Sequence, residues 1–210
     1  MLKILLADDH PAIRNGVKLI LSAEFEDVEF GEACDTNEVF KKIKECDWDM
    51  LIMDLNMPGR DGLDALKQLK EDKLRSVKTL IFSMHQEGQM AMRALRLGAC
   101  GYLSKDAPDG ELVRAVRVIL SGKKFITPEV AEQMANQLGN PDVVAINELL
   151  SDREYQTLLL FASGKNVSQI ANELSLSVST ISTYRTRILE KMGMKNNAEL
   201  VSYAFRNHLV

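Results

Sequence analysis

Carboxylate, hydroxyl and amine side chains stand at the ends of short apolar stretches in the first half of the sequence. In chain order they are Asp8, Asp9, Asp54, Ser83 and Lys105. Three carboxylates brought together would repel one another unless a cation lay between them. Mg²⁺ binds one or two carboxylates together with water and phosphate oxygens, and a nearby amine and hydroxyl would suit a phosphoryl group. The set therefore indicates a site for Mg²⁺ and phosphate, with Asp54 as the nucleophile that forms an aspartyl phosphate.

These residues meet only if the apolar stretches are parallel strands of one sheet. Five strands are expected, at 3–7, 28–33, 50–53, 79–83 and 102–104. Helical patterns follow them, from 11 to 21 and at 36–45, 63–71, 88–97 and 108–120. This alternation predicts a doubly wound α/β domain with a five-stranded parallel sheet and helices on both faces. Ligands of such sheets bind beyond the carboxyl ends of the strands, where all five polar residues would gather.

Each of these residues also has a purely structural interpretation. Asp9 could cap the helix that opens at Pro11, Asp54 could belong to a turn before Pro58, and Lys105 could be a solvated loop residue. Their joint occurrence at strand ends of one alternating pattern favours the common site.

The end of the chain has a different character. Residues 148–210 show no strand pattern, and Ser151 followed by Glu154 is typical of a capping box. Helices are expected after this box up to Gly164 and at 168–174, 178–192 and 197–207. They predict a compact all-α domain of four helices. We therefore expect domains at 1–121 and 148–210, with 122–147 as a linker that contains one short helix at 128–138.

Charge and composition restrict the function. The chain of 210 residues has a net charge of −4, but residues 177–195 carry four basic and one acidic side chain. This basic stretch favours nucleic acid, although many solvated helices have a similar balance. No apolar run approaches the roughly 20 residues of a membrane span. The three cysteines are scattered without a C-x-x-C motif, which is typical of a cytoplasmic protein with reduced thiols.

The first 121 residues resemble the receiver domain of two-component response regulators, which has the flavodoxin-like (CheY-like) fold. The matching motifs are LADDHP (6–11), MDLNMPG (53–59) with DG (61–62), FS (82–83) and GACGYLSK (98–105). The resemblance implies that Asp54 accepts phosphate from a histidine kinase. It also implies that Asp9, Asp54 and the backbone carbonyl of Asn56 bind Mg²⁺, with Asp8 acting through a water.

The same resemblance assigns the switch. Ser83 and Lys105 would bind the phosphoryl group, and the ring of Tyr102 would swing inward when Ser83 moves. His85 lies two residues after Ser83 and is a candidate for tuning the attack of water on the acyl phosphate.

The last 63 residues resemble the helix-turn-helix domain of the NarL/FixJ (LuxR-type) regulators. The matching motifs are LSDRE (150–154), LFASG (160–164), IANEL (170–174) and VSTISTYRTRI (178–188). Helical periodicity places Val178, Ile181, Ile188 and Met192 in the core. The opposite face carries Ser182, Thr183 and Thr186, which we expect to enter the major groove. The basic residues of the same helix, which we expect to contact phosphates, are Arg185, Arg187 and Lys191.

These assignments predict a regulator that dimerises on phosphorylation and binds promoter DNA, with RNA polymerase as a further partner and no membrane association. In the last helix, Leu200, Val201 and Ala204 lie at helical spacing and could add a contact between the two copies. Two alternatives remain. A phosphatase that uses an aspartyl phosphate would need a second carboxylate at position 56, which is Asn56. A constitutive DNA-binding protein would not need the acidic site.

Overall fold

The chain forms two compact units, Met1–Glu132 and Gln133–Val210. A computed structural model describes residues 1–58, 62–71, 77–84, 89–138, 150–174, 176–207 and 209. Part of the receiver-like motif at 59–61 and the candidate His85 lie outside these residues. Each unit is described by itself.

The first unit alternates strands and helices, as predicted. Its strands are β1 (Leu2–Ala7), β2 (Val28–Ala33), β3 (Met50–Met53), β4 (Lys78–Ser83) and β5 (Gly101–Ser104). Its helices are α1 (Pro11–Glu24), α2 (Thr36–Glu45), α3 (Gly62–Glu71), α4 (Gln89–Leu97) and α5 (Asp109–Leu120). The strands form one parallel sheet in the order β2-β1-β3-β4-β5. This confirms the doubly wound α/β fold.

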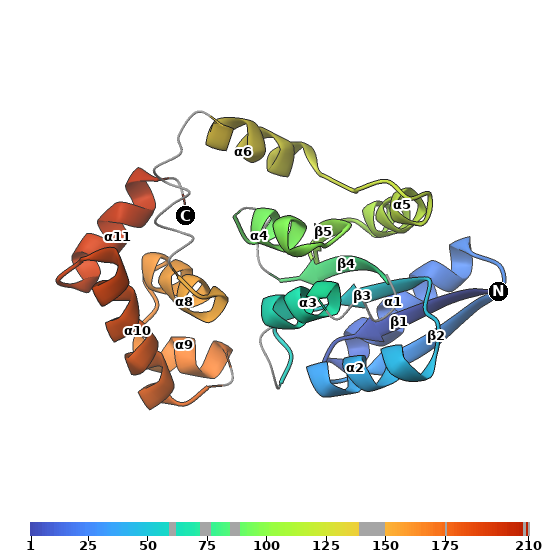
Figure 1. Ribbon diagram of the computed structural model, residues 1–210, viewed down its shortest axis with the longest axis horizontal. Coiled ribbons are helices and arrows are strands. Elements are labelled where there is room, and N and C mark those ends of the chain that lie inside the picture. The colour runs from blue at the N-terminus through green and yellow to red at the C-terminus, as the bar shows by residue number, and fades with distance from the viewer. Residues whose placement is uncertain are drawn as a thin grey trace. The chain divides into compact units, whose positions relative to one another are not determined.

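The sheet has helices on both faces (Figure 1). Strand β3 lies in its centre, and all four of its residues are buried, which is why its sequence is continuously apolar rather than alternating. Alternate residues of the strands, such as Ile4 and Ile52, pack on Val17 of α1 and Val116 of α5. Helices α2, α3 and α4 cover the other face. Burial on both sides holds the strand ends, and thus the polar residues, in fixed positions.

The chain after α5 remains attached to this unit. Phe125 belongs to the same buried cluster as α1 and α5, and its N–H donates to the carbonyl of Cys100 at 2.8 Å. Phe125 packs closely against β5, because a Cβ added at Gly101 of this strand would lie 3.0 Å from the Cβ of Phe125. The first residues of the predicted linker therefore pack on the α/β unit. Helix α6 (Pro128–Leu138) follows, with Val130 buried.

The second unit is helical over its described residues. It contains α8 (Asp152–Ala162), α9 (Val167–Glu173), α10 (Val178–Met192) and α11 (Asn197–Arg206). The capping box of Ser151 and Glu154 is present and starts α8 as predicted. Gly193 ends α10 in a left-handed conformation with φ of 65°. An apolar cluster that includes Phe161, Ile170 and Ile181 joins α8, α9 and α10.

One core prediction for α10 is wrong. Ile181 and Ile188 are fully buried, but Val178 is 52% exposed. Val178 is the first residue of the helix, whereas contact with α9 begins one turn later at Ile181. Periodicity identifies the buried face but not the point along the helix at which burial begins.

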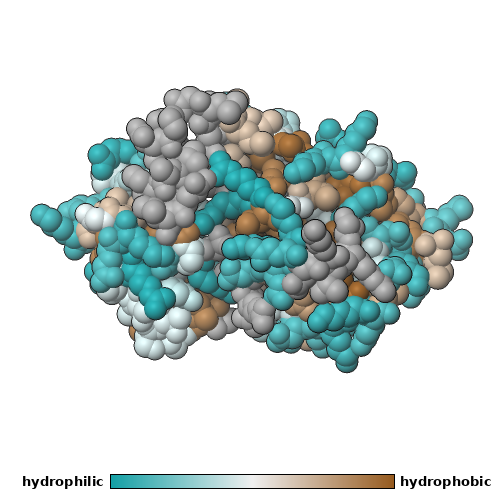
Figure 2. All heavy atoms as spheres, in the orientation of Figure 1, coloured by the Kyte–Doolittle hydropathy of each residue, from teal (hydrophilic) through white to brown (hydrophobic). Residues whose placement is uncertain are grey.

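No helix among the described residues is long and apolar enough to cross a membrane. The face shown in Figure 2 is largely hydrophilic, with separate hydrophobic areas.

Candidate functional site

Backbone hydrogen bonds hold the carboxyl ends of the strands side by side. The N–H of Asp54 donates to Ala7 at 2.8 Å, and the N–H of Lys105 donates to Ser83 at 2.9 Å. The parallel register pairs Ala7 with Met53, so Asp8 and Asp54 leave the sheet next to each other. All five polar residues of the predicted site thus lie at one edge.

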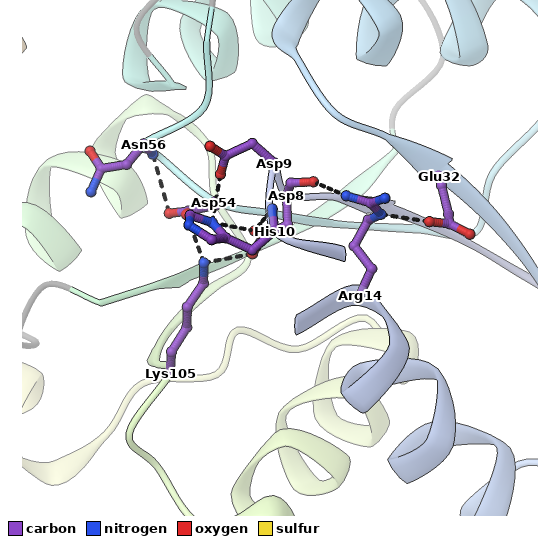
Figure 3. Close-up of polar contacts among 8 residues, drawn as sticks. All are labelled: Asp8, Asp9, His10, Arg14, Glu32, Asp54, Asn56 and Lys105. Atoms are coloured by element: carbon purple, nitrogen blue, oxygen red, sulfur yellow. Dashed lines mark hydrogen bonds and ion pairs between the residues drawn. The ribbon is translucent and has the colours of Figure 1, made fainter. Parts of the chain in front are cut away.

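Lys105 connects two of the three carboxylates (Figure 3). Its Nζ lies 2.5 Å from Asp8 Oδ2 and 2.7 Å from Asp54 Oδ2, and all three side chains are buried. Burial alone would lower the pKa of Lys105, but the neighbouring carboxylates of Asp54 and Asp8 outweigh it and raise the pKa above its ordinary value. The ammonium group therefore stays charged and offsets the repulsion between the two carboxylates.

The loop after β1 gathers further ligand atoms. The N–H of His10 donates to Asp8 Oδ1 at 2.8 Å, and His10 Nδ1 lies 2.8 Å from Asp9 Oδ1. One ligand atom each from Asp8, Asp9 and His10 lies within 4.8 Å of the others. Asp54 turns its second oxygen, Oδ1, toward the N–H of Asn56 at 3.2 Å. The edge is thus an acidic pocket made of Asp8, Asp9 and Asp54.

Ser83 and Tyr102 are both inside the protein. Ser83 is fully buried, and its Oγ has no hydrogen-bond partner among the described residues. A buried hydroxyl without a partner is costly, and a phosphoryl oxygen bound at this edge would satisfy it. Tyr102 is 2% exposed, so its side chain is buried.

The polar face of α10 is open to solvent. Ser182, Thr183 and Thr186 are exposed, and each hydroxyl donates to the backbone carbonyl four residues earlier at 2.9–3.1 Å. Arg187 is also exposed and has no polar partner among the residues that the structure describes. All four side chains are thus exposed on one helix of the described domain.

The other two basic residues of this set have contacts within the domain. Arg185 Nε donates to Asn197 Oδ1 at 2.6 Å, which connects α10 to the first turn of α11. Lys191 Nζ lies 2.6 Å from Glu154 Oε2, which also accepts the N–H of Ser151. Sequence reasoning missed this role because Glu154 lies 37 residues from Lys191.

Lys191→Met is expected to destabilise the helical unit. The side chain of Glu154 is 3% exposed and would lose its cation, whereas Lys191 is 41% exposed. Loss of one partner of a fully buried pair costs roughly 3–5 kcal/mol, and the exposure of Lys191 reduces this to about 2 kcal/mol. Urea unfolding of the whole chain, followed by circular dichroism, measures the change. Lys195→Met is the control, because Lys195 is exposed and has no ion pair among the described residues.

The Lys191–Glu154 ion pair makes the destabilisation by Lys191→Met depend on pH. Burial opposes ionisation of Glu154, but Lys191 and the Ser151 N–H outweigh it and hold the pKa below its ordinary value. The stabilisation is therefore present at neutral pH and is lost as the pH falls through the lowered pKa of Glu154, below the ordinary range of a glutamate. The difference between Lys191→Met and the parent should shrink over that range. A difference that stayed constant down to acid pH would contradict an ionic origin.

The burial of α11 corrects the predicted dimer contact. Leu200 and Ala204 are fully buried, and α11 packs on α8. Leu200 and Ala204 therefore cannot contact a second copy. The apolar face of the helix that the sequence predicted packs on the core of its own domain. Val201 is half-buried, and Phe205 is 61% exposed on the outward side.

A five-stranded sheet in this order with an acidic carboxyl edge, joined to a helical unit with an exposed polar helix, defines the response-regulator class of protein. The family comparisons agree. Residues 4–117 match the response regulator receiver domain, and residues 148–204 match the bacterial regulatory proteins of the luxR family. The chain therefore belongs to the NarL/FixJ family of two-component response regulators, with a LuxR-type DNA-binding domain. This is a family of transcription regulators and not of enzymes, which excludes the phosphatase alternative.

The similarity to known proteins covers the whole chain. The oxygen regulatory protein NreC of Staphylococcus carnosus is 35% identical and covers 100% of this chain and 99% of its own length. The response regulator GacA of Pseudomonas syringae is 35% identical, with 100% and 98% covered. Among solved structures, RcsB of Salmonella enterica serovar Typhimurium, bound to promoter rprA in the presence of the phosphomimetic BeF₃⁻, is 28% identical. Its TM-score is 0.58, and the match covers 97% of this chain and 98% of that one.

Proposed function

We propose that a histidine kinase phosphorylates this protein on Asp54 and that phosphorylation controls its binding to promoter DNA. The observation that carries the proposal is the environment of Asp54. Its carboxylate is buried at the carboxyl edge of the sheet, 2.7 Å from the Lys105 ammonium, and the neighbouring strand β4 ends at Ser83, whose buried hydroxyl has no partner among the described residues. An acceptor, a cation and a free hydrogen-bond donor are what a phosphoryl group needs.

The donor set fits Mg²⁺. Asp9 is 30% exposed at its side chain, so a hydrated cation can reach it, and Asp54 lies in the same pocket. In the proposed set, Asp9, Asp54 and the backbone carbonyl of Asn56 bind the ion directly, and Asp8 binds through a water. Hard oxygen ligands of this kind are the ones that Mg²⁺ prefers, and the bound ion would neutralise charge that develops on the phosphoryl oxygens.

The chain's own residues supply the remaining chemistry. A carboxylate oxygen of Asp54 attacks phosphorus, an O–P bond forms, and the P–N bond to the kinase histidine breaks, with the imidazole leaving. Lys105 would turn from the Asp54 carboxylate toward a phosphoryl oxygen, and Ser83 would donate its unpartnered hydroxyl to another. Because Lys105 and Ser83 share a backbone hydrogen bond, movement of one is transmitted to the other. Tyr102 lies on β5, which Lys105 directly follows, and would hold the inward position in this state.

The exposed face of α10 supports the proposed DNA interface. In this proposal Ser182, Thr183 and Thr186 meet base edges in the major groove, and Arg187 meets a phosphate. Arg185 and Lys191 also lie on the DNA-proximal helix, but we assign them first to holding α10 against α11 and α8. Solved complexes of the similar protein RcsB with promoter DNA support DNA binding by this domain.

Thr186→Glu is expected to weaken DNA binding by about tenfold or more. A carboxylate would remove the contact of the hydroxyl with a base edge and would be repelled by the acceptor-rich groove and the phosphates. Position 186 is exposed, so the fold should be kept. Fluorescence anisotropy of the unphosphorylated chain with a duplex chosen by genomic footprinting measures the change, with Ser202→Glu at an exposed position of α11 as the control. Equal DNA affinities of Thr186→Glu and Ser202→Glu would show that α10 does not contact the DNA.

The proposed function also assigns the domains, the dimer surfaces and the partners. Residues 1–121 form the proposed receiver, 148–210 the DNA-binding domain, and 122–147 the connection, whose first residues pack on the receiver. On phosphorylation two copies would pair, through the surfaces of α4 or α5 and through the outward side of α11 at Val201 and Phe205. A kinase and promoter DNA as partners imply a cytoplasmic protein, with RNA polymerase as the next partner.

A further inference from the structure

Arg14 of α1 connects the acidic edge to the neighbouring strand. Its Nη1 donates to the backbone carbonyl oxygen of Asp8 at 2.6 Å, and its Nε donates to Glu32 Oε2 at 2.5 Å. The Arg14 side chain is 13% exposed. In Figure 3 its guanidinium group lies between Asp8 and Glu32. One side chain therefore links the end of β1 to β2 at the point where the acidic loop begins.

Asp8 is held at each of its polar groups. Its N–H donates to Ala33 at 3.1 Å, and its carboxylate accepts the N–H of His10 and pairs with Lys105. The carbonyl is the remaining group, and Arg14 donates to it. The Asp8 carbonyl and the Asp9 N–H belong to the same planar peptide unit. Fixing the carbonyl therefore fixes the direction in which the chain enters Asp9.

Glu32 keeps Arg14 in this position. Lys18 and Arg14 both donate to the Glu32 carboxylate, and these bonds lower its pKa below the ordinary value. Glu32 is thus charged at neutral pH, and the planar guanidinium can bind it and the Asp8 carbonyl together. Lys18 pairs with the same carboxylate, but in the described part of the chain it makes no contact with Asp8.

We propose that Arg14, clamped by Glu32, is a positioning residue that sets the orientation of Asp9 for binding the divalent cation. This inference rests on the proposed Mg²⁺ site. If Arg14 orients Asp9, replacing Arg14 should change the affinity for the metal ion. If Arg14 only holds α1 on the sheet, that affinity should not change. Residues that orient metal ligands typically change metal affinity by about 10–100-fold when they are replaced.

The test measures metal binding without phosphorylation. Mn²⁺ serves as the probe, and the electron paramagnetic resonance signal of the free ion is followed as it is titrated into the whole chain. Arg14→Met should weaken Mn²⁺ binding about tenfold. Lys18→Met removes the same charge from the same carboxylate and should leave the affinity within about twofold. Glu32→Gln should weaken binding through Arg14. Arg14→Lys keeps the charge but not the fork, and its affinity should lie between those of the parent and Arg14→Met.

The outcomes separate the inference from the function on which it rests. Equal affinities of Arg14→Met and Lys18→Met, with similar thermal midpoints, would overturn the positioning role. If Arg14→Met does not fold, Arg14→Lys and Glu32→Gln decide, and parental affinity in both would overturn it as well. A parent that binds no Mn²⁺, or that binds it equally after Asp9→Ala, would instead contradict the metal site itself.

Discussion

Asp54→Asn is expected to abolish phosphorylation of the chain. An amide is not a nucleophile toward phosphorus, whereas asparagine keeps the size of the side chain at this buried position. Lys105 would keep its pair with Asp8, so the fold should be retained. Incubation with acetyl phosphate and Mg²⁺, followed by intact-protein mass spectrometry, measures the attached phosphoryl group.

The matched control makes the same substitution at the other end of the same strand. Asp49 immediately precedes β3, and its Oδ2 accepts the N–H of Lys3 at the edge away from the acidic pocket. Asp49→Asn should be labelled like the parent. Labelling of Asp54→Asn at the parental level would show that the acceptor is a different residue.

Lys105→Met is expected to separate phosphorylation from DNA binding. The proposed cation would be held by the carboxylates and would not need the ammonium group, so Mn²⁺ affinity should be kept. The phosphoryl group would, however, lose its ion pair with the Lys105 ammonium. That ammonium connects it to the end of β5 and, through the Lys105–Ser83 backbone hydrogen bond, to the end of β4. Pairing of two DNA-binding domains on adjacent half-sites should raise the affinity of the phosphorylated parent by about a hundredfold. In Lys105→Met this gain should disappear. Anisotropy titrations with and without beryllofluoride measure it.

Lys78 provides the control for this variant. It is a partly buried lysine at the start of β4, and its Nζ donates to the carbonyl of Leu120 at 2.9 Å, away from the acidic edge. Lys78→Met should keep the phosphorylation-dependent gain. A full gain in Lys105→Met would contradict the coupling role and leave Lys105 as a neutralising charge only.

The fold and the edge at which the site lies could be predicted because they depend on local patterns. Met50–Met53 is apolar throughout and Asp54 follows at once, and the structure ends β3 between them. Parallel strands then bring the ends of β1 and β3 together without further information. The capping box at Ser151 is equally local, since its two side chains lie within one helical turn.

The contacts that decide function are long-range and could not be predicted in this way. The pairing of Lys105 with both Asp8 and Asp54 depends on the register of four adjacent strands, from β1 to β5. Helical periodicity at Leu200 and Ala204 shows a buried stripe, but it does not distinguish the domain's own core from a second copy. Phe125 lies in a segment whose composition predicts a linker, yet it fills space beside Gly101 that only the folded sheet creates.

Phosphorylation of Asp54 is proposed to switch the assembly and DNA affinity of the whole chain. Sedimentation of the parent and of Asp54→Asn, each with a two-half-site promoter duplex and with or without beryllofluoride and Mg²⁺, measures this switch. Only the parent should gain mass, from a monomer to a dimer on the duplex, and only when beryllofluoride is present. An equal mass and equal duplex affinity of the parent in both conditions would rule out the switch and favour constitutive DNA binding.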